Sequence, residues 1–95
     1  MPDPERDVDV LVRRLRGLSA RAWATGGRRD VVRRLCADLV ALGEPGHVLP
    51  ELPDHGLGDA VAVLSHEALQ YQAAQQNGRR DEVAAAVRRA LEETK

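Results

Sequence analysis

Arginine is the residue type that could do most chemistry in this chain, because it is concentrated in one stretch. Residues 13–34 contain eight arginines and one acidic residue, whereas residues 35–67 contain six acidic residues and no lysine or arginine. A dense set of guanidinium groups favours binding to a phosphate backbone or to an acidic partner. We prefer the interpretation that the two blocks pair as salt bridges, within the chain or across a dimer, because a charge run is most often a solvated face.

Four arginines of the basic block could act together from one helix as nucleic-acid contacts: Arg28, Arg29, Arg33 and Arg34. The helical turn before them is short, and the Gly26-Gly27 pair is an unusual join for a helix-turn-helix motif. The net charge of −1 also lacks the basic excess that is typical of DNA-binding domains. Nucleic-acid binding through residues 13–34 is therefore our second hypothesis.

Histidine and cysteine do not form a metal-binding pattern. Zinc ligands on one helix lie three or four residues apart, and no pair among His47, His55 and His66 has that spacing. Cys36 is the only cysteine, so an internal disulfide and a cysteine-based zinc site are excluded. We predict no metal and no cofactor; a loop histidine that meets Cys36 in space stays open as the alternative.

The hydroxyl and thiol groups show no catalytic arrangement either. Ser19 is placed to cap a helix, whereas Ser65 and Cys36 fall inside predicted helices, with no strand-to-helix turn to present them. Cys36 lies on an apolar stripe, which favours a buried and inert thiol. No glycine-rich segment matches a phosphate-binding loop. We therefore predict that the chain is not an enzyme.

Two families of small helical proteins share features with this sequence. Residues 56–64 are similar to the start of the acyl-carrier protein helix that carries a phosphopantetheine arm, but Ala60 follows Asp59 where a serine would be needed. Helical chorismate mutases are also arginine-rich and of this length. They need one long first helix, which Gly17 and the Gly26-Gly27 pair interrupt here. We assign the chain to neither family.

Trp23 and a glutamine-rich segment are candidates for contact with a partner. Trp23 is the largest side chain in a sequence with one other aromatic residue, Tyr71. We expect it to fill the end of the core; the alternative is an anchor in a partner interface, where tryptophan is enriched. Uncharged polar side chains near Tyr71 are more typical of a contact surface than of a solubilising one: Gln70, Gln72, Gln75 and Gln76.

Four amphipathic helices and one short helical turn must position these residues. Apolar residues recur at helical spacing over residues 4–16, 28–42, 54–76 and 81–93, and an extra turn over 20–24 carries Trp23. Asp3 and Ser19 are suitable N-caps. Three prolines stiffen the long loop at residues 44–54, whose apolar residues we expect to lie on the bundle: Val48, Leu49 and Leu52.

The composition indicates one all-α domain over residues 1–95. The chain has no Phe and no Ile, so Leu, Val and Ala must form the core, and leucine and alanine favour helices. Mostly short connections favour antiparallel neighbours, so an up-down four-helix bundle is the simplest arrangement, with one longer crossover. The scarcity of lysine and asparagine suggests a GC-rich bacterial genome, and the acidic N-terminus without an apolar stretch makes the cytoplasm the expected location.

These observations favour a non-enzymatic helical protein that acts by protein–protein contact, as a homodimer or as an accessory or regulatory subunit. The residues that we single out for contact with a partner or with nucleic acid are Trp23, Arg28, Arg29, Arg33 and Arg34. A third hypothesis is a ligand binder or enzyme that uses His47, His55 and the long loop. Ligand sites in bundles need convergent polar groups, and the sequence shows none.

Overall fold

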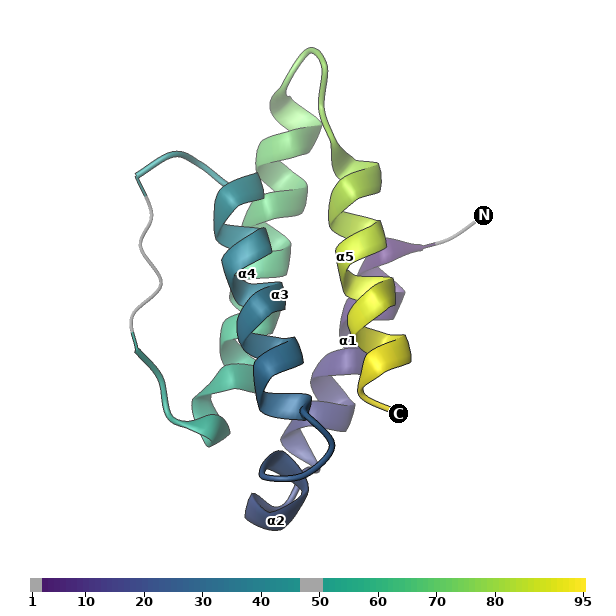
Figure 1. The fold of residues 1–95 in the computed structure, drawn as a ribbon. Coiled ribbons are helices and arrows are strands. Elements are labelled where there is room, and N and C mark those ends of the chain that lie inside the picture. The colour runs from purple at the N-terminus through teal and green to yellow at the C-terminus, as the bar shows by residue number, and fades with distance from the viewer. Residues whose placement is uncertain (1–2, 47–50) are drawn as a thin grey trace.

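The computed structural model describes residues 3–46 and 51–95, and in them it contains five helices and no strand (Figure 1). The helices are α1 (Pro4–Arg16), α2 (Ala20–Trp23), α3 (Arg28–Leu42), α4 (Asp54–Ala74) and α5 (Arg80–Glu93). The prediction of an all-α fold, a small bundle of four longer helices, is confirmed. The predicted helix ends agree with the observed ones to within two residues, which is the usual uncertainty of such boundaries.

Local sequence signals set the ends of the first three helices. The Asp3 carboxylate accepts hydrogen bonds from the backbone N–H groups of Glu5 and Arg6, at 3.1 and 3.3 Å. The Ser19 hydroxyl accepts one from the Ala22 N–H at 3.1 Å, and so caps α2. Gly26 and Gly27 both have φ near +70°, a left-handed conformation that glycine adopts without steric cost, and they turn the chain into α3.

The core is built from leucine, valine and alanine contributed by all four longer helices. Its innermost apolar side chains are 2% exposed or less: Leu11, Leu15, Val32, Leu39, Leu57, Val61, Val83 and Val87. Leu52, in the connection before α4, packs against this core, as predicted. Val48 and Leu49, for which the same prediction was made, lie outside the described residues.

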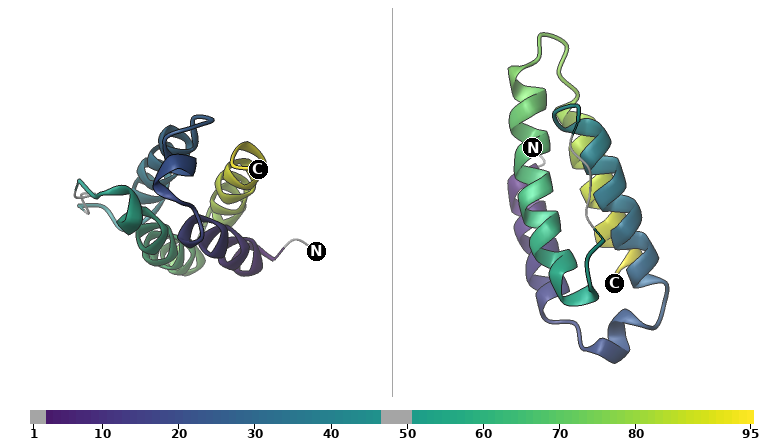
Figure 2. Two further views of the ribbon diagram at one scale, coloured as in Figure 1. Left: turned by 90° about the horizontal axis from the view of Figure 1, so that it is seen from below. Right: turned by 90° about the vertical axis from the view of Figure 1, so that its left-hand side faces the viewer.

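The four longer helices form two parallel pairs. Seen end-on, successive corners of the bundle are occupied by α1, α4, α3 and α5 (Figure 2, left). Arg29, at the start of α3, contacts Asp54, at the start of α4, and the ends of the two helices also meet, at Leu42 and Gln72. In the same way α1 runs parallel to α5, because Arg14, near the end of α1, donates to the carbonyl of Leu91, near the end of α5.

This arrangement differs from the strict up-down order that we took as simplest. Residues 43–46 and 51–53 lie at opposite ends of the bundle, and α3 and α4 point the same way (Figures 1 and 2). Bundles with a long crossover connection commonly show such an order. Pro45 and Pro53 therefore lie near opposite ends of the bundle rather than in one tight turn.

Gln72 holds together the end of the bundle where α3 and α4 finish. Its side chain is 6% exposed; the amide nitrogen donates to the Leu42 carbonyl at 2.5 Å, and the amide oxygen accepts from the Arg79 N–H at 2.8 Å. The turn into α5 packs so closely that Gly78 has no room for a Cβ against the Gln72 carbonyl oxygen. The prediction that Gln72 belongs to a contact surface is therefore wrong, because it is buried by these three helix ends. Gln70, Gln75 and Gln76 are exposed.

None of the helices in the described part of the chain has both the length and the apolar character that crossing a bilayer requires.

We predict that Gln72→Leu lowers the free energy of unfolding by about 1–3 kcal/mol, because it leaves the Leu42 carbonyl buried without this partner and removes the half-buried hydrogen bond from the Arg79 N–H. Urea denaturation followed by circular dichroism measures this change. Gln76→Leu is the matched control on the exposed side of the same segment, and should change stability by no more than about 0.5 kcal/mol. Equal midpoints for the wild type and Gln72→Leu would contradict the assigned role.

Candidate functional site

Most arginines of the basic block are engaged within the chain. Of the eight, five donate hydrogen bonds to carboxylates or carbonyls of the described residues: Arg14, Arg16, Arg28, Arg29 and Arg33. Arg13, Arg21 and Arg34 have no such partner in the part of the chain that the structure describes, and they lie on three different helices. Two of the five, Arg16 and Arg29, pair with carboxylates of the acidic block, and the other three donate to backbone carbonyls.

Arg29 binds both oxygens of one carboxylate. Its guanidinium donates two parallel hydrogen bonds to the Asp54 carboxylate, at 2.8 and 2.6 Å. These hydrogen bonds, and next the charges of Arg29 and Arg33, lower the pKa of Asp54 despite its partial desolvation. Arg33 also donates to the Leu52 carbonyl at 3.2 Å, so the start of α3 is fastened to the start of α4 and to the connection before it.

Two further arginines hold the end of α5. Arg14 donates to the Leu91 carbonyl at 2.7 Å and to the Thr94 hydroxyl at 3.1 Å, and Arg28 reaches the Lys95 carbonyl at 3.5 Å. The last carbonyls of a helix have no partner inside it and carry partial negative charge, so cationic donors stabilise them. Arg28 and Arg29, two of the predicted nucleic-acid contacts, are therefore used largely for structure.

Trp23 is 4% exposed and belongs to the core, where it closes the end of the bundle as expected. A side chain so deeply buried presents little surface to anchor a partner. Its edge lines a cavity of about 520 Å³ between the ends of α1 and α2 and the start of α4, and His55 also lines that cavity. His47 lies outside the described residues.

The hydroxyl and thiol side chains are placed for structure. Cys36 is fully buried, and desolvation raises the pKa of its thiol to about 11. Thr94 is also buried and donates to the Ala90 carbonyl at 2.7 Å. The buried Ser65 hydroxyl has no hydrogen-bond partner among the described residues. Residues 3–46 and 51–95 contain no group of three or more His, Cys, Asp or Glu side chains able to hold a metal ion.

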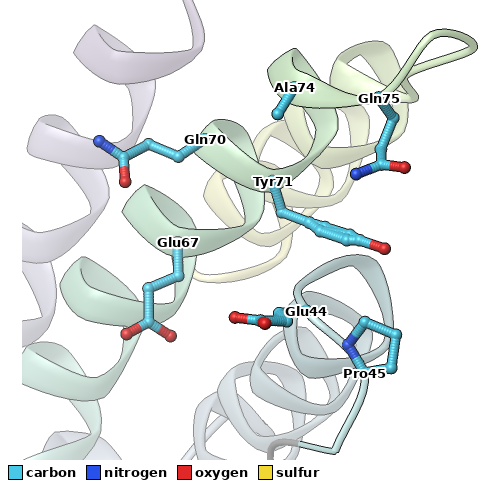
Figure 3. Close-up of a pocket in the computed structure, with 7 residues that line it drawn as sticks. All are labelled: Glu44, Pro45, Glu67, Gln70, Tyr71, Ala74 and Gln75. Atoms are coloured by element: carbon cyan, nitrogen blue, oxygen red, sulfur yellow. The ribbon is translucent and has the colours of Figure 1, made fainter.

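The most distinctive cavity lies where α3 and α4 end, and we call it the carboxyl-end pocket. It has a volume of about 530 Å³, and Figure 3 shows the half-buried Tyr71 ring extending across it from α4 towards the residues that follow α3. Its lining residues are Glu44, Pro45, Glu67, Gln70, Tyr71, Ala74 and Gln75. An aromatic ring with amides and carboxylates around it is suited to a ligand that has both an apolar stem and a polar head.

The electrostatics of the carboxyl-end pocket favour a cation. Parallel packing brings the carboxyl ends of α3 and α4 together, each with a partial negative charge. Neither last turn contains a basic residue, whereas α1 has three arginines in its last turn and α5 receives Arg14. Glu44 and Glu67 add formal negative charge. A second groove adjoins the pocket and shares Tyr71 with it. The basic residue that lines this groove is Arg79, which pairs with Glu82 at 3.1 Å.

Sequence reasoning found part of this pocket. It singled out Tyr71, Gln70 and Gln75 as an uncharged polar surface, but it missed Glu44 and Glu67, which are 23 residues apart in the chain. The available signal was the lack of lysine and arginine in the last turns of two consecutive helices. Comparison with protein-family models, with curated proteins and with solved structures finds no match to this chain.

We predict that Asp54→Asn lowers the thermal midpoint at neutral pH, because it removes the acceptor of the paired hydrogen bonds from Arg29. A lowered pKa stabilises the fold above the ordinary carboxyl pKa of about 3.9, and this contribution is lost as the pH falls through the lowered value. The difference between wild type and variant should therefore shrink in acid. Asp59→Asn is the control, because the Arg16–Asp59 pair is more exposed and its loss should cost less.

We predict that Cys36 reacts with iodoacetamide only when the bundle opens. The thiol is buried, and with a pKa of about 11 it is protonated at neutral pH, whereas alkylation requires the thiolate. Mass spectrometry should show slow labelling of the native protein and rapid labelling in guanidinium chloride. Equal labelling rates under both conditions would contradict the burial of this residue.

Proposed function

We propose that this chain is a non-catalytic helical interaction module that binds a basic segment of a partner protein at the carboxyl-end pocket. The observation that carries the proposal is the pairing of two carboxyl helix ends without a basic residue in either last turn. A lysine or arginine from a partner would be attracted by the partial negative charge of these two helix ends. The arginine-rich and lysine-poor composition supports our further assignment of the module to a bacterium, and we keep the cytoplasm as its proposed location.

Tyr71 gives the pocket a means of selecting a cationic side chain. The stem of a lysine or arginine can lie along an aromatic ring while its charged head stays in water near carboxylates. The attraction of a cation to a ring face is worth about 0.5–1 kcal/mol at an exposed site. Gln70 and Gln75 offer amide donors and acceptors for the main chain of an extended peptide. The expected contact is therefore polar, small and reversible.

A different protein fits this role better than a second copy of the chain. Five arginines have no side-chain partner among the described residues, and they are spread over four helices: Arg6, Arg13, Arg21, Arg34 and Arg80. They therefore form no continuous basic segment in the part of the chain that the structure describes. Homodimer formation is the competing outcome, and light scattering at micromolar concentration distinguishes it. Nucleic-acid binding through residues 13–34 is weakened as an alternative, because five of its eight arginines make contacts within the chain.

We predict that a tetra-arginine peptide shifts the backbone amide signals of residues 44–46 and 67–75 in a nuclear magnetic resonance titration. Tyr71→Leu should weaken this binding about two- to fivefold, the factor that corresponds to one exposed cation–π contact. A tetraglutamate peptide serves as the control ligand, and it should leave these signals in place.

Glu67→Gln and Glu51→Gln form the matched pair of variants for this titration. Both remove one negative charge, but Glu67 lines the pocket, whereas Glu51 precedes Leu52, whose carbonyl accepts a hydrogen bond from Arg33 in the first part of α3. The proposal requires weaker binding for Glu67→Gln alone. Equal weakening by both variants would show that the peptide responds to net charge only. Binding of duplex DNA at low salt, lost on replacing Arg13, Arg21 and Arg34 with alanine, would favour the nucleic-acid alternative.

A further inference from the structure

The turn between α4 and α5 leaves the reactive atoms of an Asn-Gly pair free. Asn77 and Gly78 are both exposed. Neither the Asn77 carboxamide nor the Gly78 N–H makes a hydrogen bond to any residue that the structure describes. Asn77 is also the only asparagine of the chain. A glycine after asparagine places no side chain beside the backbone nitrogen, so that nitrogen can approach the carboxamide carbon.

We propose that Asn77 is a modification site, at which the chain converts spontaneously to aspartate and isoaspartate. The Gly78 backbone nitrogen loses its proton to solvent and attacks Cγ of Asn77. The bond from Cγ to the amide nitrogen breaks, ammonia leaves, and a five-membered succinimide forms. Water then opens the ring at Cγ to give aspartate, or at the backbone carbonyl to give isoaspartate. The net reaction consumes one water and releases one ammonia, with no oxidation or reduction.

The isoaspartate product conflicts with the packing of this turn. In isoaspartate the main chain runs through Cβ and Cγ, so the turn gains one backbone atom. The turn is held by hydrogen bonds from the N–H groups of Gln75 and Arg79 to the Gln72 carbonyl and side chain, at 3.3 and 2.8 Å. Gly78 has no space for a Cβ against the Gln72 carbonyl. A longer main chain cannot keep these contacts, so the product should be less stable than the starting protein.

The reaction also changes the charge beside the carboxyl-end pocket. Asn77 lines the groove that adjoins the pocket and shares Pro45, Tyr71 and Gln75 with it. Either product adds one negative charge there, to a chain whose net charge is −1. The proposal does not depend on the function proposed for the pocket, because it rests on the geometry of the turn alone.

The test is to age the purified, folded protein in mildly alkaline buffer and to follow it by peptide mass spectrometry. A free peptide covering residues 73–80 is aged alongside it. We expect Asn77 to gain the mass of an amide-to-acid conversion at a rate of the same order as in the peptide, with isoaspartate as the larger product. An unchanged Asn77 in the folded protein after the peptide has converted would overturn the proposal.

Asn77→Gln is the control variant, because its longer side chain would need a six-membered ring and should not convert. If the intact variant gains mass as fast as the wild type, the site is not Asn77. A thermal melt of the aged protein provides the second readout. A lower midpoint in the aged wild type but not in aged Asn77→Gln is expected, and equal midpoints in a fully converted sample would overturn the assigned conflict with Gln72.

Discussion

The parallel packing of α3 against α4 is the constraint on which the other features of this bundle depend. Both helices start at one end of the bundle and finish at the other. At the shared start, Arg29 and Asp54 form a paired hydrogen bond. At the shared finish, Gln72 crosses from α4 to the last carbonyl of α3. Each end thus has its own polar contact, and both contacts hold the same pair of helices in register.

The same packing explains the unequal distribution of charge along the sequence. Helix starts carry partial positive charge and helix ends partial negative charge, and the arginine block lies where the ends of α1 and α5 meet the start of α3. Arg14 and Arg28 reach the end of α5, while Arg16 and Arg29 pair with acidic residues near the start of α4. At the far end, neither α3 nor α4 has a basic residue in its last turn, and the arginine beside them, Arg79, pairs with Glu82 of α5. The two poles of a chain of nearly zero net charge therefore differ in their helix-end chemistry.

Much of this fold can be predicted from the sequence, because helix ends are local features. Asp3, Ser19 and the Gly26-Gly27 pair act on neighbouring backbone groups, and the structure shows them where their residue types predict. The direction of α4 cannot be predicted in this way, because an eleven-residue connection is long enough either to turn back at once or to return along the bundle.

Side-chain partners across the bundle depend on that direction, and for this reason they also escaped prediction. Gln72 looked like one of four equivalent surface glutamines, and only the return of α4 alongside α3 buries it under the turn into α5. Glu44 and Glu67 come together for the same reason. The burial of Trp23, in contrast, was the expected outcome of its position near the end of an aromatic-poor core.

The chain contains one tryptophan and one tyrosine, and the bundle places them at opposite ends. Trp23, the last residue of α2, lies in the core, and Tyr71 lies in the carboxyl-end pocket. The molecule therefore carries a separate intrinsic fluorophore at each pole. Tryptophan emission reports on solvent entry at the α2 end, and tyrosine emission reports on the surroundings of the carboxyl-end pocket. The two ends of the folded bundle can therefore be followed separately by fluorescence, without an attached label.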